Sequence, residues 1–328
     1  MTLKSFLLDL LQARWYERVP ILYAWYEHSI KQEVLGGSIP QHIAIIQDGN
    51  RRYAKKLGQS TEKGHMYGAD TVERVLNWCD EIGVLQLTLY GFSTENFNRP
   101  EKEKKAIFSI MKEKSKQLRE SERTHKLKLR IRSLGDMDML PKDLKDEIAK
   151  TDSATANYDK FYLNLAVAYG GRQEIVDSAR KMARDVQNGT LSPDDITEDM
   201  VGGYLYLDRN PNSDVDLIIR TGGDERTSNF LPWQASGNEC AIYISAPYWP
   251  EFRKIDFLRA IRSYQIREKE HKVKLAVSII KIKRQDGDIS DVNLRENLSL
   301  ALKIGSEEAQ ELLDSPLVKK ELAKPVKA

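Results

Sequence analysis

The chain has 328 residues, enough to bury a substantial core in one large domain with appendages. Its 51 Lys and Arg residues nearly balance its 49 Asp and Glu residues, leaving a formal charge of +2. No overall field attracts nucleic acid, so we expect no nucleic-acid partner and a locally built site for any anion. Cys79 and Cys240 lack metal-ligand spacing and are too few for a disulfide framework, which favours a cytoplasmic protein.

Residues 1–40 are predicted to form amphipathic helices. Apolar residues recur at helical spacing from Leu3 to Leu11 and from Ile21 to Ile30, and Pro20 separates the two runs. Charged residues interrupt the first run, so we predict neither a signal peptide nor a spanning helix. The apolar faces would pack on the core or in a dimer, although their aromatic residues also suit shallow, peripheral seating at a membrane surface.

Apolar runs of strand length alternate with helical patterns between residues 41 and 271. Strands separated by helices imply right-handed βαβ units, so we predict an α/β fold with a mostly parallel central sheet flanked by helices. Residues 272–328 are charged and patchy, and we predict a C-terminal appendage with a short helix at 294–304. The predicted strands are residues 43–47, 85–92, 126–135, 161–169, 215–221 and 241–246.

Four polar clusters follow predicted strands: DGNRR at 48–52, FSTENFNRP at 92–100, YGGRQEI at 169–175 and RTGGDERTSNFLPWQ at 220–234. Each alone could be an ordinary turn. In an open α/β sheet, however, the carboxyl ends of the strands are where ligands bind. Paired arginines near exposed amides suit phosphate groups, so the clusters together predict an oligophosphate site with a divalent cation. The glycine fingerprints of nucleotide sites are absent, which disfavours a nucleotide.

The segment DDITE at 194–198 carries the acids of an aspartate-rich metal motif. It follows Ser192 and Pro193, however, and a Ser N-cap, a Pro at the first helical position and acids in the first turn make an ordinary helix start. We therefore predict no metal site there.

Together, the four clusters resemble the signatures of the cis-prenyltransferases, the undecaprenyl diphosphate synthase family. The resemblance runs from His42 to Arg267 and also includes Gly64-His65, Glu239 and WPEF at 249–252. The extended N-terminus and the DGNRRYA form of the first motif resemble the archaeal branch. The family implies sequential addition of isopentenyl diphosphate to an allylic prenyl diphosphate, with geranylgeranyl diphosphate as the expected primer. The product would be a Z-polyprenyl diphosphate, a glycosyl carrier lipid precursor such as undecaprenyl diphosphate.

The resemblance also implies roles for single residues. Asp48 matches the aspartate that handles Mg²⁺ and diphosphate, and Glu239 matches a metal ligand supplied across a homodimer. Asn96 matches the residue assigned as proton acceptor, but a neutral amide is a poor base, so we expect it to orient or relay the proton. The other matches are substrate-binding positions: Gly49, Asn50, Arg51, Arg52, Tyr53, His65, Ser93, Thr94, Glu95, Phe97, Arg99, Arg220, Arg226, Thr227 and Ser228.

The growing product is a hydrocarbon, so it needs an apolar product tunnel. Each candidate lining residue could instead be ordinary core. The candidates are Val72, Leu76, Leu87, Leu89, Phe108, Ile110 and Met111.

The sequence departs from the family pattern at three positions. Thr61 stands where the family usually has an arginine, and Lys63 is a candidate substitute for it. Asp224 stands where the family generally has glutamate, and Gly237 stands where tyrosine is common. These changes bear on allylic affinity and on substrate selectivity, and they leave the central residues in place.

We considered two alternative functions. The first is a non-catalytic partner subunit of a heteromeric synthase. Such a subunit could lose Asp48 or the Arg226 and Ser228 pair, and this chain keeps all three, which disfavours that alternative. An unrelated phosphate-binding hydrolase would need an activated nucleophile, and the sequence offers none.

Overall fold

The structure is a computed structural model that describes residues 20–207, 214–235, 240–285 and 291–324. The chain divides into two compact units, Met1–Tyr264 and Gln265–Ala328. The division falls inside one helix, α10 (Lys254–Gln285). The boundary after residue 271 stays a prediction from sequence.

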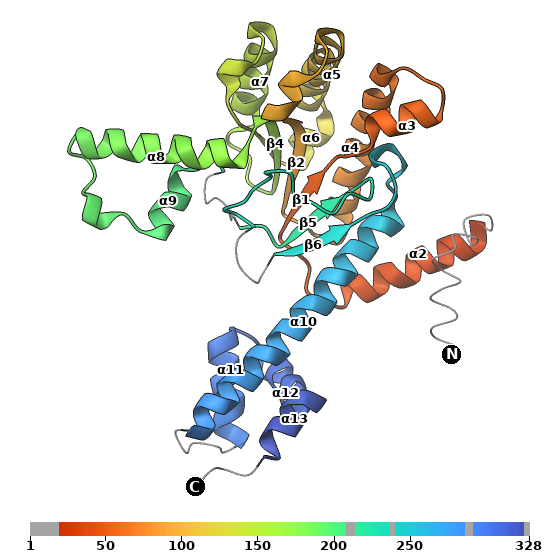
Figure 1. Cartoon of the computed structure of the whole chain (residues 1–328). Coiled ribbons are helices and arrows are strands. Elements are labelled where there is room, and N and C mark those ends of the chain that lie inside the picture. The colour runs from red at the N-terminus through yellow and green to blue at the C-terminus, as the bar shows by residue number, and fades with distance from the viewer. Residues whose placement is uncertain (1–19, 208–213, 236–239, 286–290, 325–328) are drawn as a thin grey trace. The chain divides into compact units, whose positions relative to one another are not determined.

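A six-stranded sheet with every strand pair parallel forms the centre of the first unit (Figure 1). The strand order β3-β4-β2-β1-β5-β6 places the early strands on one side of β1 and the late ones on the other. The order therefore reverses between β1 and β5, the position where such sheets bind ligands. The strands are β1 (His42–Ile46), β2 (Gln86–Ser93), β3 (Leu129–Leu134), β4 (Phe161–Tyr169), β5 (Leu217–Arg220) and β6 (Ala241–Ile244).

The predicted α/β sheet is thus confirmed. The third strand begins later than predicted, because the residues before it form α6 (Glu122–Lys126) and a turn at Lys128 with a φ of 47°. The alternation of apolar residues cannot show that the first residues of a predicted strand belong to the preceding helix and turn.

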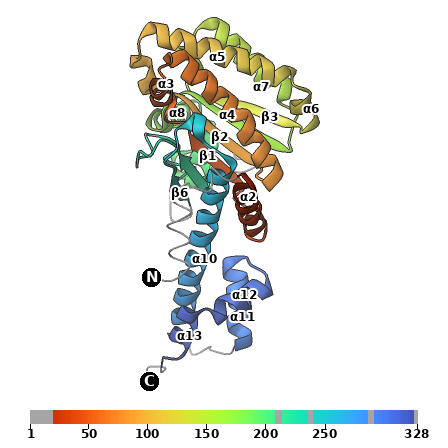
Figure 2. The ribbon, with the colours of Figure 1, turned by 90° about the vertical axis from the view of Figure 1, so that its right-hand side faces the viewer.

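Helices α4, α5 and α7 cover one side of the sheet (Figure 2). Ser60 caps α4, accepting a hydrogen bond from Lys63 N at 3.5 Å, and Gly83 ends the helix with a φ of 89°. The helices of this unit include α3 (Asn50–Lys56), α4 (Thr61–Ile82), α5 (Glu101–Glu120), α7 (Lys142–Thr155), α8 (Gly171–Gln187) and the short 3-10 helix η2 (Thr94–Asn98).

The DDITE segment does begin helical structure. Pro193 opens a short 3-10 helix, Pro193–Asp195, although the Ser192 side chain makes no capping bond. A second helix, α9 (Glu198–Tyr204), then starts after Thr197, whose side chain accepts a hydrogen bond from Met200 N at 3.2 Å.

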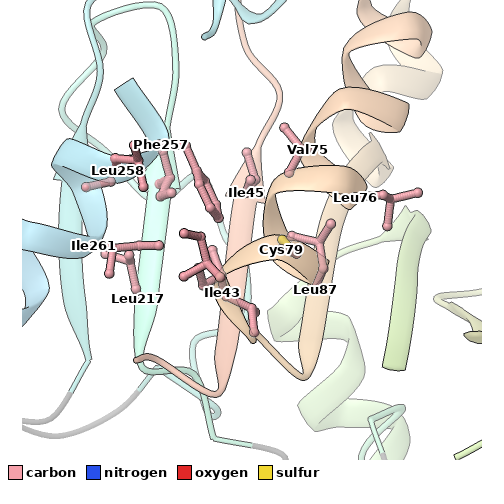
Figure 3. Close-up of a cluster of buried hydrophobic side chains, with 14 of the residues drawn as sticks. Ile43, Ile45, Val75, Leu76, Cys79, Leu87, Leu217, Phe257, Leu258 and Ile261 are labelled. Atoms are coloured by element: carbon pink, nitrogen blue, oxygen red, sulfur yellow. The ribbon is translucent and has the colours of Figure 1, made fainter. Parts of the chain in front are cut away.

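The first unit's main core lies between β1 and the helices α4 and α10 (Figure 3). Ile43 and Ile45 of β1 are fully buried between Val75 and Cys79 of α4 and Phe257 of α10. Each buried aliphatic side chain contributes about 1.5–3 kcal/mol relative to an exposed one. This core fixes β1, the strand that leads into the first polar cluster.

The second predicted N-terminal helix is α2 (Pro20–Leu35). Ile30 and Val34 are buried, whereas Ile21 and Trp25 are 81% and 67% exposed. The first predicted helix lies outside the described residues. None of the described helices is both long enough and apolar enough to span a membrane.

The second unit holds the end of α10 together with α11 (Asp291–Leu302), α12 (Ser306–Asp314) and α13 (Pro316–Leu322). It has its own apolar cluster, in which Ala276, Leu294, Leu298 and Val318 are fully buried. The helix predicted at 294–304 is therefore present as α11, although α11 begins three residues earlier and ends at Leu302, before Lys303, which has a φ of 52°.

Candidate active site

The loop between β1 and α3 begins the candidate site. Gly49, the N-cap of α3, has a φ of 106°, and a Cβ there would lie 2.7 Å from Cδ1 of Tyr248. The main-chain carbonyl of Asp48 accepts hydrogen bonds from Trp249 N at 2.9 Å and from Thr221 Oγ1 at 2.8 Å. Only glycine fits this turn, and the two bonds fix the point from which the Asp48 side chain projects.

Arg220, at the end of β5, connects the first cluster to the last. It is only 3% exposed. Its Nη2 donates to Asp48 Oδ2 at 2.8 Å, and its Nη1 donates to Ser228 Oγ at 2.6 Å and to the Arg226 carbonyl at 2.5 Å. Burial by itself raises the pKa of Asp48, but the Arg220 hydrogen bond and the charge of Arg52 outweigh it, so the pKa lies below its usual value. Asp48 is therefore ionised at neutral pH.

A second carboxylate, Asp224, lies among the same cations. Its oxygens are 3.2 Å from Arg226 Nη2, 3.3 Å from Arg220 Nη2 and 3.6 Å from Arg52 Nη1. Arg52, Arg220 and Arg226 thus face two carboxylates, Asp48 and Asp224. The excess positive charge suits an anion, and the planar guanidinium groups suit phosphate oxygens.

Glu103, in the first turn of α5, organises the opposite side of the site. Its Oε1 lies 3.2 Å from Arg99 Nη1, 3.3 Å from His65 Nε2 and 3.8 Å from Arg51 Nε. Burial lowers the pKa of His65, the charges of Arg99 and Arg51 lower it further, and Glu103 opposes them without reversing the shift. His65 is therefore a neutral imidazole at pH 7.

The loop after β2 holds Ser93 and Asn96 in a reciprocal cap. Asn96 Oδ1 accepts a hydrogen bond from Ser93 N at 3.2 Å, and the Ser93 side chain accepts one from the Asn96 backbone. With its carbonyl oxygen engaged, Asn96 can present its NH₂ group to a ligand. That arrangement suits orientation of a ligand better than removal of a proton.

One polar cleft of about 1290 Å³ joins the two sides, and Glu103 contacts Arg99 and His65 of its lining without being a lining residue itself. The cleft also receives Gln47, Lys55, Arg172, Asp224 and Asn229. The predicted site residues that line it are Asp48, Gly49, Asn50, Arg51, Arg52, His65, Ser93, Glu95, Asn96, Arg99, Arg220, Arg226 and Ser228.

Four residues predicted to bind substrate, Tyr53, Thr94, Phe97 and Thr227, are not among those that line the cleft. The Tyr53 ring packs edge-on against Tyr67, with 5.8 Å between centroids. The Phe97 ring packs in the same way against Phe92 at 5.0 Å. Tyr53 thus packs α3 against α4, and Phe97 packs η2 against β2.

An apolar cavity of about 350 Å³ lies between the sheet and helices α4, α5 and α6. Of the predicted tunnel residues, Val72, Leu76, Leu89, Ile110 and Met111 line it. The other two do not: Leu87 is fully buried in the main core, and Phe108 packs against Phe92 with 5.1 Å between ring centroids. Leu87 and Leu89 lie on one face of β2, so strand alternation alone could not separate them.

The polar cleft and the apolar cavity adjoin, because Gln47, Asn50, His65, Gly91 and Ile107 line both. We call these residues the neck. Within the described chain, Nε2 of Gln47 and Oδ1 of Asn50 are buried and find no hydrogen-bond partner. Buried polar atoms are normally paired, so a polar group bound at the neck would satisfy them.

Asp48 and Asp224 offer the hard carboxylate oxygens that Mg²⁺ prefers. Their side chains remain 29% and 35% exposed. Across the described residues, no group of three His, Cys, Asp or Glu side chains could hold a metal ion. A cation here would therefore need further oxygens, and a bound diphosphate could supply them. Glu239, the second predicted metal ligand, lies outside the described residues, as does Gly237.

The comparison with known families decides the class. A family model described as "Putative undecaprenyl diphosphate synthase" matches residues 46–272. The chain belongs to this family. Its members are cis-prenyltransferases, so the protein is an enzyme that builds polyprenyl diphosphates of Z geometry.

Individual relatives support the archaeal resemblance. This prenyltransferase is 49% identical over 264 residues to a tritrans,polycis-undecaprenyl-diphosphate synthase (geranylgeranyl-diphosphate specific) of Methanosarcina mazei, covering 80% of this chain and 89% of the relative. It is 50% identical over 246 residues to the enzyme of the same name from Haloarcula marismortui, covering 75% and 80%.

A solved structure supports the fold of this prenyltransferase. Lavandulyl diphosphate synthase from Lavandula x intermedia, in complex with dimethylallyl diphosphate, matches with a TM-score of 0.63 and 32% identity. The match covers 71% of this chain and 96% of that one.

Glu103 and Asn229 were not predicted from sequence, although both shape the site of this prenyltransferase. Glu103 belongs to the charged run EKEKK, which is typical of a solvated helix face. The available signal was its spacing four residues after Arg99, which permits an ion pair. Asn229 sits in the last motif, but its bonds to α8 could not be seen without the fold.

Replacing Glu103 with Gln is expected to lower the pKa of His65 further. The carboxylate favours the protonated imidazole, so its removal leaves burial and the two arginine charges unopposed. NMR titration of the histidine signals in the substrate-free protein measures the shift. Glu113→Gln, on the same helix and bonded to Gln117 instead, is the matched control and should leave His65 unchanged. A His65 pKa that stays constant or rises in Glu103→Gln would contradict this account.

Proposed function

We propose that this prenyltransferase uses geranylgeranyl diphosphate as its allylic primer and elongates it with isopentenyl diphosphate. The product would be a Z-polyprenyl diphosphate that serves as a glycosyl carrier lipid precursor, such as undecaprenyl diphosphate. The names of the two archaeal relatives support the primer. The observation that carries the proposal is the cationic cleft that opens, through the neck, onto an apolar cavity. A molecule with a diphosphate head and a hydrocarbon tail would place its head in the cationic cleft and its tail in the apolar cavity.

The reaction makes demands that these residues suit. The allylic carbon–oxygen bond breaks, diphosphate leaves with the electron pair, and the double bond of isopentenyl diphosphate forms the new carbon–carbon bond. Charge develops on the leaving oxygens, where Arg51 and Arg52 at the start of α3 would stabilise it. The proton then lost from the new unit would pass to a diphosphate oxygen, with the Asn96 NH₂ group orienting the acceptor.

The second substrate would bind at the other end of the cleft. Arg220, Arg226 and Ser228 lie together there and offer donors to a diphosphate. Arg226 is 70% exposed, so its side chain has room to fold onto a ligand. Arg51 and Arg99 contact Glu103, whereas Arg52, Arg220 and Arg226 face Asp48 and Asp224, and these two arginine clusters support two diphosphate sites in one cleft.

Mg²⁺ is the proposed cofactor, as is general among prenyl diphosphate synthases. Asp48 would bind it with diphosphate oxygens, because the low pKa of this residue keeps the carboxylate charged. Bound there, the ion would neutralise charge on the diphosphate. We further propose that the active unit is a homodimer in which Glu239 of the second chain completes the metal site.

A shallow, peripheral membrane contact is the last part of the proposal. Ile21 and Trp25 are exposed on the same side of α2, one helical turn apart. An exposed aromatic and aliphatic pair suits the interface of a bilayer, where a hydrocarbon product would be delivered. A cytoplasmic enzyme could make this peripheral contact without a membrane-spanning helix.

The direct test combines purified protein with geranylgeranyl diphosphate, isopentenyl diphosphate and Mg²⁺, followed by mass spectrometry of the products. Asp48→Ala should lower the turnover rate by about 10² to 10³, the cost of removing one preorganised charged group. Asp143→Ala removes an exposed carboxylate paired with Lys112 on α5 and is the matched control. A near-normal rate in Asp48→Ala, or no elongated product from the unaltered protein, would contradict the proposal.

Replacing Gly91 with Leu should shorten the products. Gly91 lines both the cleft and the cavity, and a Cβ there would lie 3.3 Å from Cε of Met111. A larger side chain would fill the neck through which the growing chain must pass. Gly203→Leu is the control, since a Cβ at Gly203 meets no atom within 4 Å. An unchanged product distribution from folded Gly91→Leu would place the product elsewhere.

The homodimer makes a separate prediction. If each site takes Asp48 from one chain and Glu239 from the other, Asp48→Ala and Glu239→Ala homodimers are both impaired. A mixed dimer then has one intact site and one doubly damaged site. Mixing the two variants should recover up to about half of the unaltered activity per mixed dimer. Differently tagged chains verify subunit exchange, and exchange without recovery would count against a shared site.

A further inference from the structure

The loop after β5 holds several residues in an unfavourable backbone conformation. Ser228, Asn229 and Leu231 have φ values of 50°, 60° and 48°. Residues with a Cβ rarely adopt this left-handed region, and asparagine tolerates it better than most. Ser228 lines the polar cleft. Contacts elsewhere must therefore hold this part of the loop in place.

Asn229 makes those contacts with the start of α8. Its main-chain carbonyl accepts a hydrogen bond from Gly171 N at 2.9 Å, and its side-chain Oδ1 accepts one from Arg172 N, also at 2.9 Å. The first amides of a helix have no partner within the helix. The N-cap of α8 is Gly170, which has no side chain to offer them. Asn229 thus caps α8 from a loop 57 residues away.

The glycine pair of the YGG motif makes this approach possible. A Cβ on Gly171 would lie 3.0 Å from the Asn229 carbonyl oxygen and 2.0 Å from Cδ of Pro232. A Cβ on Gly170 would lie 3.3 Å from Nδ2 of Asn229 and 2.8 Å from Oγ1 of Thr94. The loops that follow β2, β4 and β5 therefore meet at these two glycines.

The same loop is fixed on its other side by Arg220 and Tyr90. Arg220 Nη1 donates to Ser228 Oγ at 2.6 Å, and Tyr90 OH donates to the Ser228 carbonyl at 3.4 Å. The Tyr90 ring stacks on Phe230, with 4.4 Å between centroids. Ser228 and Phe230 are the immediate neighbours of Asn229. The position of Asn229 therefore bears directly on how Ser228 presents its hydroxyl to the cleft.

We propose that Asn229 is a positioning residue. It caps α8 from the loop after β5, and in doing so it holds Ser228 and Arg226 in the arrangement that binds isopentenyl diphosphate. Its own side-chain oxygen accepts a hydrogen bond from Arg172 N and therefore has a structural role and does not bind substrate. The inference rests on the proposed function in one respect, the assignment of Arg226 and Ser228 to that substrate.

Two full-length variants separate the parts of this role. Asn229→Gly keeps access to positive φ but loses the side-chain acceptor, and Asn229→Ala loses both. In the substrate-free protein, Asn229→Gly should speed amide hydrogen exchange at Arg172, and Asn229→Ala should speed it at Gly171 as well. Asn229→Asp keeps an acceptor and should protect Arg172 as the unaltered protein does. Because the added charge of Asp also faces the cleft, that variant is compared by exchange alone.

Kinetics test the link to substrate. The KM for isopentenyl diphosphate should rise about tenfold in Asn229→Ala and by a smaller factor in Asn229→Gly, while the KM for geranylgeranyl diphosphate changes less than twofold. Thr197→Ala is the control, because it removes a comparable cap from α9, outside the cleft, and should leave both KM values unchanged. If Asn229→Ala does not fold, Asn229→Gly carries the test.

Unchanged exchange at Arg172 in Asn229→Gly would overturn the proposal, and so would equal rises in both KM values. Faster exchange with an unchanged KM for isopentenyl diphosphate would also refute the link to substrate. If the unaltered protein makes no elongated product, the proposed function has failed, and the exchange measurement still decides whether Asn229 caps α8. The two failures are therefore distinguishable.

Discussion

The candidate site depends on the pairing of Arg220 with Asp48. Arg220 is 3% exposed, and a cation so deeply buried is unfavourable unless an anion and further acceptors surround it. Asp48 supplies the charge at 2.8 Å, while Ser228 Oγ and the Arg226 carbonyl accept from the other nitrogen. One guanidinium group therefore ties the end of β1 to the whole loop after β5. The Thr221 hydroxyl, which donates to the Asp48 carbonyl at 2.8 Å, joins the same two segments through the main chain.

The parallel sheet makes that pairing possible. Ile46 of β1 and Arg220 of β5 are register partners, so the residues that follow them emerge at the same edge, where the strand order reverses. Gly222, with a φ of 84°, then turns the chain so tightly that a Cβ would lie 2.6 Å from Arg52 Nη2. The cationic cleft is thus built from backbone turns as much as from side chains. Along β2, Leu89 lines the apolar cavity, Ser93 lines the polar cleft and Gly91 lines both, so this strand runs from the site for hydrocarbon to the site for charge.

Charge is distributed unevenly around the cleft. Arg52, Arg220 and Arg226 surround Asp48 and Asp224, and on the opposite side Arg51 and Arg99 share the single carboxylate of Glu103 with a neutral His65. Both sides keep more positive than negative charge without a ligand. That state is tolerable in the open cleft because water screens the exposed arginines, and it becomes favourable when an oligophosphate enters.

The sequence by itself determined the strands and the polar motifs, because strand periodicity and turn chemistry are local. Apolar runs located β1, β2, β4 and β5 closely, and the strand-end clusters contained Asp48, Arg220 and Ser228, which share one cleft. It could not separate Leu89 in the cavity from Leu87 in the core, since both lie on one face of β2. Nor could it show that Glu103 faces His65 or that Asn229 caps α8. Only the tertiary structure decided these contacts, because they join residues far apart in the chain and depend on strand order and helix placement.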